Sequence, residues 1–348
     1  MKIGSYSGLC KEAPLSICPL LGGPFGLPSK CYGKGYKVGS VYIFEVPTFI
    51  IYLVSWLMIG IMISNIRQKA NGIGQKEFIT FFYIYFVHLI LEALTVSNII
   101  PTASDAYLVK THVSSNNQKY IASFHYGSSV TLTWCLFLNS FVIYQFLAAG
   151  EKKSVWGMRF SSLAVFVFGT FLAISTFKSW LGLSPLNPTL LWWLHIVFPN
   201  VFVVTFFITQ VTFVYFRLDN KWPIGDLINS YLFYVISQVL ISSLSSTLCE
   251  ASRHYLDGHF FQALSLLCSV MMLYKYWDSI NYDDMEFTID PIRKDQLPGP
   301  PRTSDGEILN FESDESSEED HEEIIDKKNP RPKRRSRILM SKSIFCPQ

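Results

Sequence analysis

Glu92 and His88 are the strongest candidates for chemistry within the apolar part of this 348-residue chain. They are four residues apart, which places both side chains on one face of a helix. An ionisable side chain inside a membrane span is costly, and it usually serves binding or transport. The structural alternative is an interhelical hydrogen bond that only sets packing. We favour that alternative for His88 and leave both interpretations open for Glu92.

The other polar residues give weaker indications of a reaction. His125 and His195 are near the ends of apolar runs, and His254 and His259 flank a loop. A metal-dependent hydrolase would need paired ligands on facing helices, for example at a four-residue spacing. The sequence contains no Gly-x-Ser-x-Gly, phosphate-binding loop or Cys-x-x-Cys. We therefore predict no catalytic residue, no metal ligand and no cofactor, and expect purified protein to contain no metal.

The composition predicts that these residues are carried by membrane-spanning helices. The chain is 49% hydrophobic and only 16% charged, whereas a soluble protein carries about 25% charged residues. Seven apolar windows are long enough to cross a bilayer. They are residues 46–65, 78–100, 121–149, 155–177, 190–216, 227–248 and 259–276. We expect an all-α polytopic membrane protein, a bundle of seven transmembrane helices, with Pro199 kinking the fifth.

The distribution of Lys and Arg predicts the orientation of the bundle. The loops after the first, third and fifth windows carry more basic residues than the loops after the others, and basic loops face the cytosol. The N-terminus is therefore expected on the lumenal or exterior side and the C-terminus in the cytosol. Lys30, Lys34 and Lys37 argue against this orientation because basic residues resist translocation.

Four cysteines fall on the predicted oxidising side: Cys10, Cys18, Cys31 and Cys249. An even number on that side is enough for two disulfides, with three possible pairings. If all four pair, one bridge ties the N-terminal segment to the loop before the last span. Free thiols are the alternative.

Three regions follow from these patterns: a Cys-containing lumenal segment 1–45, a membrane domain 46–278 and a charged cytosolic tail 279–348. The tail holds an acidic block at 312–323 and a basic block at 327–337, a composition typical of disorder. Ser316 and Ser317 each precede an acid by three residues, which suits an acid-directed kinase. The basic block suits anionic lipid headgroups rather than nucleic acid. Asp284 and Glu286 form an acid-x-acid motif of the kind that the ER vesicle coat recognises.

The end of the membrane domain resembles the fungal chitin synthase export chaperones. The residues that carry the resemblance are Cys249-Glu250, His254–Gly258, Phe260-Phe261, Met271–Lys275, Trp277-Asp278 and Asp283–Phe287. Weaker islands lie upstream, at Cys10, Pro14-Leu15, Cys18, Cys31-Tyr32, Asn65–Lys69, Ile73-Gly74, Glu77 and Thr176–Trp180. The chain departs from the family pattern at Ser16 and Lys30, and its tail from Arg293 onward is longer than expected.

The resemblance implies a seven-span protein of the ER membrane that keeps a chitin synthase from aggregating and promotes its exit. It implies no enzyme activity, and its four-cysteine pattern agrees with two disulfides. The expected partners are a chitin synthase, the ER vesicle coat and the lipid bilayer. Glu92, Ser242 and Ser245 are candidate contacts to the client, although small hydroxyl residues such as these serines ordinarily serve helix packing.

Two other classes of function remain as alternatives. The first is an intramembrane metal-dependent hydrolase that uses the histidines and Glu92. The second is a seven-span receptor or transporter, an interpretation that rests on the number of spans alone.

Overall fold

The computed structural model describes residues 4–22, 26–34, 36–38, 41–43, 45–69, 74–97, 116–144, 151–218 and 220–295. For residues 37, 38, 41–43, 96, 97, 116–118, 143 and 282–295 it describes the backbone alone. Met1–Pro291 form one compact unit and Ile292–Gln348 a second. Ser316, Ser317 and both charge blocks lie outside the described residues.

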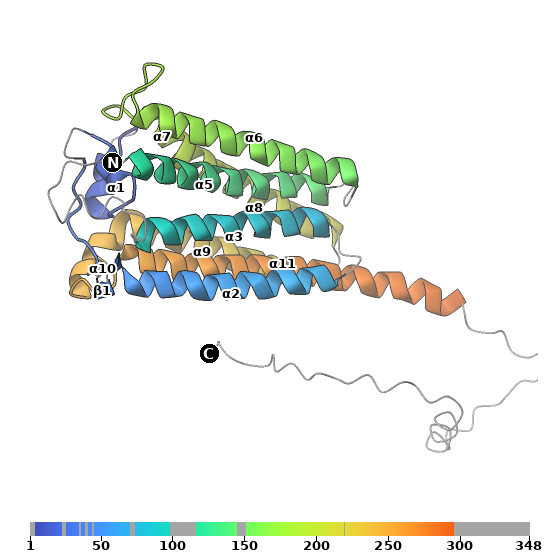
Figure 1. Cartoon of the computed structure of the whole chain (residues 1–348). Helices are drawn as coiled ribbons and strands as arrows, with labels where there is room; N and C mark the ends of the chain where they lie inside the picture. The colour runs from blue at the N-terminus through green and yellow to red at the C-terminus, as the bar shows by residue number, and fades with distance from the viewer. Residues whose placement is uncertain are drawn as a thin grey trace, which may run out of the picture. The chain divides into compact units, whose positions relative to one another are not determined.

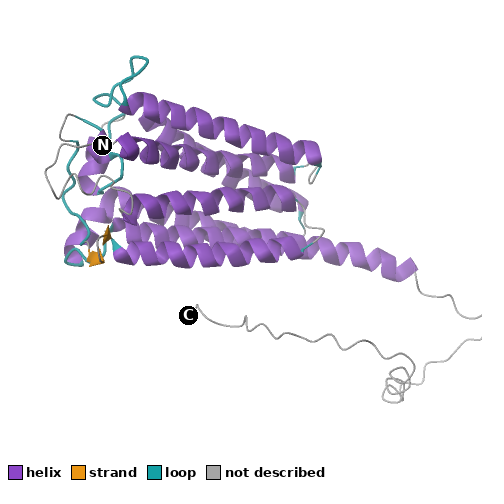
Figure 2. Cartoon of the chain, in the orientation of Figure 1, coloured by secondary structure: helices purple, strands orange, loops and turns teal. Residues whose placement is uncertain are grey.

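Long helices dominate the first unit and run side by side (Figure 1). They are α2 (Val46–Gln68), α3 (Gln75–Ser97), α5 (Asn116–Ile143), α6 (Lys152–Phe177), α8 (Phe198–Arg217), α9 (Pro223–Val239) and α11 (Gly258–Asp295). The expected helical membrane fold is confirmed in this coarse form. The one departure within the described residues is a small antiparallel hairpin of β1 (Tyr36–Val38) and β2 (Val41–Ile43), which pairs Tyr36 with Ile43 (Figure 2).

Two of these helices continue through a π-helical segment. Residues Trp193–Val197 (η2) join the short α7 (Thr189–Trp192) to α8, and Leu240–Leu244 (η3) join α9 to α10 (Ser245–Ala251). Pro199 follows η2 directly. Proline has no backbone N–H to donate, and in a regular α-helix its ring would clash with the carbonyl of residue 195. The wider π-helical turn gives the ring room. A π-helical turn thus precedes Pro199, and the expected kink stays a prediction.

Five of the described helical segments are long and apolar enough to cross a membrane. They are Val46–Gln68, Gln75–Thr95, Lys152–Phe177, Thr189–Arg217 and Pro223–Ala251. The helices α5 and α11 cover the third and seventh predicted windows but carry more polar residues. The prediction of seven spans is thus supported at five positions and stays a prediction at the other two. Helix α11 also continues to Asp295, beyond the expected boundary at residue 278.

The side chains of the bundle are sorted as a lipid environment requires. Large apolar side chains such as Leu57, Phe160 and Val167 are exposed on its outside. Polar side chains such as Gln210 and Asn139 are buried inside, where Gln210 accepts a hydrogen bond from Tyr276 at 2.7 Å. In water this arrangement would be unstable, and in lipid it removes polar groups from hydrocarbon.

The two ends of the bundle differ in chemistry. The basic ends of α2 and α8 and the basic start of α6 lie together at one end (Figure 1). Two ion pairs lie there, Lys69 with Asp278 and Lys275 with the buried Asp226 at 2.9 Å. The N-terminal residues and the loop before α11 lie at the opposite end (Figure 1). Which of the two ends faces the cytosol stays a prediction.

Helices α5 and α6 approach closely at Gly127. A Cβ atom on Gly127 would lie 3.0 Å from the backbone oxygen of Phe166 and 3.1 Å from the backbone nitrogen of Thr170. Opposite it, a Cβ atom on Gly169 would lie 3.4 Å from the Cα atom of Gly127. Small residues let helix backbones pack directly in membranes, where helix association depends on van der Waals contact. His125 lies two residues before this contact on α5.

Candidate functional site

Two disulfides organise the segment that covers one end of the bundle. We call residues 4–22 and 26–34 the N-terminal cap; it contains α1 (Ser7–Glu12) and η1 (Cys18–Leu20). Cys10 is bonded to Cys18, with Cα atoms 5.6 Å apart, and Cys31 is bonded to Cys249, with Cα atoms 6.2 Å apart. The first bridge closes the cap on itself, and the second joins it to α10. The sequence left these pairings open.

Hydrogen bonds attach the same cap to three further parts of the bundle. The Tyr6 hydroxyl donates to the Leu191 carbonyl at 3.2 Å, and the Lys34 amide donates to the His254 carbonyl at 2.7 Å. The Glu12 carboxylate pairs with Lys30 and accepts a hydrogen bond from Ser246. Lys30 first, and then Ser246, lowers the pKa of Glu12 below its ordinary value. The cap is thus a tightly attached part of the bundle.

Two buried carboxyl groups lie beneath the cap, at the starts of α2 and α11. Asp257 accepts hydrogen bonds from the Phe260 amide at 3.1 Å and from the Thr48 hydroxyl at 3.5 Å, and so caps the start of α11. Glu45 precedes α2. Burial raises the pKa of Glu45 well above its ordinary value, and the charge of Asp257 and a hydrogen bond with it add to the shift. Glu45 therefore favours its protonated form.

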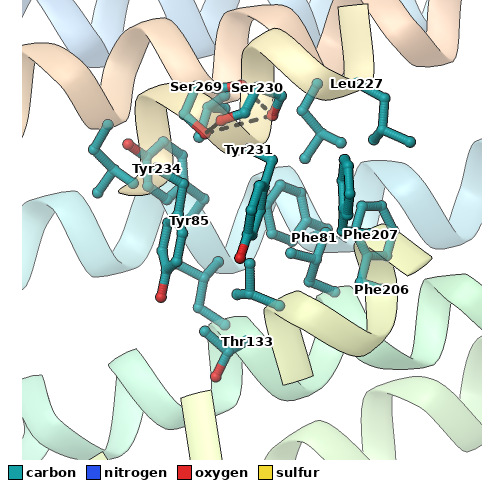
Figure 3. Close-up of a pocket in the computed structure, with 16 residues that line it drawn as sticks. Phe81, Tyr85, Thr133, Phe206, Phe207, Leu227, Ser230, Tyr231, Tyr234 and Ser269 are labelled. Carbon is teal, nitrogen blue, oxygen red and sulfur yellow. Dashed lines mark hydrogen bonds between the residues drawn. The ribbon is translucent and has the colours of Figure 1, made fainter. Parts of the chain in front are cut away.

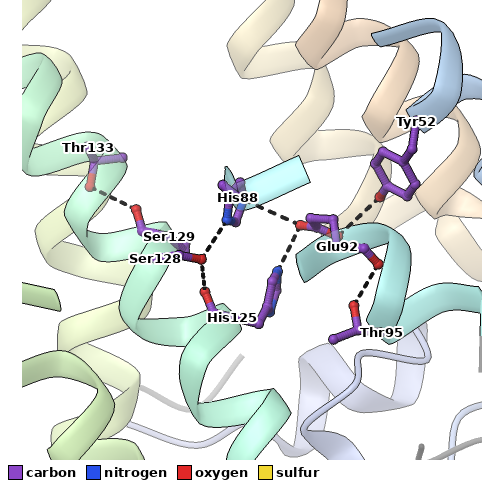
Figure 4. Close-up of polar contacts among 8 residues, drawn as sticks. All are labelled: Tyr52, His88, Glu92, Thr95, His125, Ser128, Ser129 and Thr133. Carbon is purple, nitrogen blue, oxygen red and sulfur yellow. Dashed lines mark hydrogen bonds and ion pairs between the residues drawn. The ribbon is translucent and has the colours of Figure 1, made fainter. Parts of the chain in front are cut away.

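Further into the bundle, Glu92 meets two histidines from different helices (Figure 4). Its Oε1 atom lies 3.0 Å from Nε2 of His125 on α5 and 3.6 Å from Nε2 of His88, one turn earlier on α3. The two imidazole rings stack with centroids 5.2 Å apart. One ligand atom from each of the three residues falls within 4.8 Å of the others.

A second layer of hydrogen bonds fixes this cluster. The Tyr52 hydroxyl donates to Oε2 of Glu92 at 3.1 Å. The Ser128 hydroxyl donates to the His125 carbonyl at 2.7 Å, and its oxygen lies 2.9 Å from Nδ1 of His88. The carboxylate of Glu92 therefore has internal partners on both oxygens. A client would reach it only by displacing them.

The two serines predicted as client contacts lie in different environments. Ser245 is buried against Gly258, where a Cβ atom on that glycine would lie 2.3 Å from the serine hydroxyl. It therefore packs the loop before α11. Ser242 is half-buried in η3, and its hydroxyl lies 3.4 Å from that of Ser243, which is exposed on the outside of the bundle.

An apolar pocket lies between α3, α5, α8, α9 and α11 (Figure 3). Its walls include Phe81, Tyr85 and Tyr231. Its polar members Ser230 and Ser269 each donate to the carbonyl of the other, at 2.9 and 2.8 Å. Because these hydroxyls satisfy each other, the pocket offers apolar surface and no reactive group. It suits a hydrocarbon chain rather than a polar substrate.

The acid-x-acid motif at Asp284 and Glu286 falls on α11, in the part described by its backbone alone. In a helix, positions two residues apart lie on different faces. A receptor that reads the two acids together would therefore need this part of α11 to unwind.

Sequence reasoning singled out Glu92 and His88 on one helix face but missed the other partners of Glu92. Tyr52 and Ser128 carry no sequence signal, because hydroxyl residues are common in spans. His125 was assigned to a span end, and its contact with Glu92 needs the register between α3 and α5. Glu45 and Asp257 had a weak signal, since each is an acid immediately before an apolar run.

A family model described as "Chitin synthase export chaperone" matches residues 2–291. A chitin synthase export chaperone of Cryptococcus neoformans is 38% identical over 83% of this chain and 77% of its own length. Those of Coccidioides immitis and Aspergillus fumigatus are 34% and 32% identical, each over 83% of this chain and 86% of their own length. No solved structure matches.

Proposed function

Because this chain belongs to the chitin synthase export chaperone family, we propose that it binds a chitin synthase in the ER membrane and accompanies it to the site of exit. The family match carries this proposal, since it covers residues 2–291 and so coincides with the compact unit Met1–Pro291. A family described by export and chaperoning suggests a protein that is not an enzyme.

Membrane physics explains why a synthase would need such a companion. A client span with a polar face is costly in lipid until its own neighbours assemble around it. Exposed polar groups of several clients would pair with each other and aggregate. A companion that offers complementary hydroxyl groups from within the bilayer prevents this by occupying those groups first. The outside of this bundle is apolar enough to stay in lipid while it does so.

We place the client contact at the hydroxyl pair Ser242 and Ser243 on η3. Several other hydroxyls of the bundle bond to their own helix: Thr205 donates to Val201 at 2.8 Å and Thr212 to Ile208 at 2.7 Å. The only hydrogen bond described for the hydroxyls of Ser242 and Ser243 joins them to each other, so one of the two protons remains free to donate. In lipid, that donor would be satisfied by a client carbonyl or side chain. Glu92 then supports this surface indirectly, by holding α2, α3 and α5 together.

Seven spans with a lumenal N-terminus complete the proposal. Both disulfides lie at the end of the bundle opposite the basic helix ends, which fits an oxidising lumen on one side and the cytosol on the other. At ~1.5 Å per residue, α5 is long enough to cross the bilayer as well. Its polar residues are accommodated because the other helices surround it.

We expect export of the synthase to depend on this chain and on its acid-x-acid motif separately. In a fungal host that lacks the chain, the synthase should stay in the ER, and the wild-type chain should restore its delivery to the cell surface. The double variant Asp284→Ala, Glu286→Ala should still bind the synthase but leave it in the ER. Surface fraction and co-purification of the synthase measure the two steps.

Normal surface delivery in the host without the chain would contradict the proposed function. Normal delivery with the double variant would contradict the exit motif alone. The matched control is the pair Ser316→Ala, Ser317→Ala in the tail, for which we expect unchanged binding and delivery.

A photoreactive amino acid at position 243 should cross-link the synthase in ER membranes. The reason is that Ser243 is exposed on the proposed contact surface. The control places the same group at Leu163, which is 57% exposed on α6. We expect at least five-fold more cross-linked synthase from position 243. Equal yields at the two positions would exclude η3 as the contact.

A further inference from the structure

The geometry points to a metal site: we propose that His88, Glu92 and His125 bind one divalent transition-metal ion, with zinc the best fit. The proposal goes beyond the export function and does not rest on it. It differs from the expectation that the sequence alone supports, because His125 lies 33 residues after Glu92 in the chain and on another helix.

The first argument is the spacing of the ligand atoms. In a tetrahedral zinc site with bonds of about 2.0–2.2 Å, neighbouring ligand atoms lie ~3.4 Å apart. Here the Glu92 Oε1 atom lies 3.0 Å from Nε2 of His125 and 3.6 Å from Nε2 of His88. All three ligand atoms can therefore bind one ion with small adjustments (Figure 4).

The second argument concerns where the protons are. The only proton of the Ser128 hydroxyl goes to the His125 carbonyl, so its oxygen must accept from Nδ1–H of His88. Neutral His88 then has a lone pair on Nε2, which faces the Glu92 carboxylate. Neither ring nitrogen of His125 makes a hydrogen bond of good geometry within the described residues, although both are buried. Lone pairs of the two histidines and of the Glu92 carboxylate therefore face one another. A cation bound between them would accept all three.

The third argument is the outer layer of the cluster. Metal-binding histidines usually donate their second N–H to a fixed acceptor, and metal-binding carboxylates accept further hydrogen bonds. His88 donates to Ser128, and Glu92 accepts from Tyr52 at 3.1 Å. Two histidines and one carboxylate suit zinc and also ferrous iron. Because the ligands come from α3 and α5, the bound ion would fasten these two helices.

The test is the metal content of the full-length chain, purified in detergent with a tag that contains no histidine or cysteine. We expect about one zinc per wild-type chain by elemental mass spectrometry, and at least a ten-fold loss in His125→Gln and in Glu92→Gln. A chelator should lower the Tm of the wild type, zinc should restore it, and Glu92→Gln should not respond. Ser128→Ala should weaken zinc binding by roughly 10- to 100-fold without abolishing it.

The control is His254→Gln, because the two sulfur atoms near His254, those of Cys31 and Cys249, are bonded to each other and so cannot bind a metal as thiolates. We expect this variant to keep its metal. The proposal is overturned if wild-type protein reloaded with zinc, manganese or ferrous iron retains less than a tenth of an equivalent. It is equally overturned if the metal persists in both His125→Gln and Glu92→Gln, or is lost in His254→Gln instead.

Discussion

Replacing Cys31 and Cys249 together by serine is expected to destabilise the protein more than any other change to its cysteines. This bridge joins residues 218 apart in the sequence. In the chain-entropy account, a closed loop of this length stabilises the folded state by roughly 5 kcal/mol. The pair Cys10→Ser, Cys18→Ser opens a loop of 8 residues and should cost about half as much. Thermal unfolding of the detergent-solubilised chain, followed by size-exclusion chromatography, measures both.

Loss of the long-range bridge should also release the N-terminal cap and reduce surface delivery of the synthase. The matched control is Cys268→Ser, because Cys268 is a free, half-buried thiol and should change the Tm very little. An unchanged Tm in Cys31→Ser, Cys249→Ser would mean that the cap's hydrogen bonds suffice. Equal losses in all three variants would mean that any cysteine change harms this protein, and the bridge would have no special role.

Gly127→Leu should separate α5 from α6 and give the second large effect. The new side chain would need the space that the backbone of Phe166 and Thr170 occupies, and backbone atoms cannot move aside as a side chain can. We expect a loss of roughly 3 kcal/mol and a fall in Tm of roughly 5–10 °C. Because His125 lies on α5, moving this helix would displace a proposed zinc ligand, and the variant should also lose most of its bound zinc.

Gly157→Leu on α6 is the matched control, since nothing lies within 4 Å of a Cβ atom at that position. It introduces the same side chain into α6, which packs against α5, but at a position that faces open space. Its Tm should stay within about 2 °C of the wild type, because surface changes rarely exceed ~0.5 kcal/mol. If both variants unfold at the same temperature, direct backbone packing at Gly127 does not hold the two helices together.

The sequence predicted the helices well because the features that define them are local in the chain. Long apolar runs, basic loop ends and Pro199 act within a few residues, so they can be read along the chain. Cys10, Cys18, Cys31 and Cys249 were also found, because the predicted orientation placed them on one side. Their pairing depends on how the N-terminal cap packs against α10, and the sequence does not reveal this tertiary contact.

The site was predicted only in part, for the same reason. Glu92 stood out because a carboxylate in a span is rare, but its partners lie on α2 and α5. The contact between Glu92 and His125 depends on the register between α3 and α5, which the sequence does not reveal. The sequence also does not reveal that Gly258 packs against Ser245, whose contact with a client stays a prediction. Helix α11 extends beyond residue 278 because a polar sequence can remain helical outside the membrane.

The long-range disulfide also constrains how the protein is made. With the proposed lumenal N-terminus, Cys31 enters the lumen early, whereas its partner emerges from the ribosome 218 residues later. At about 5–20 residues per second, translation imposes a delay of roughly 10–40 s. During this interval Cys31 is a reactive thiol next to Cys10 and Cys18, which can already pair with each other. The nascent chain therefore needs an oxidoreductase that can undo an early wrong bridge, and its maturation time depends on lumenal redox conditions.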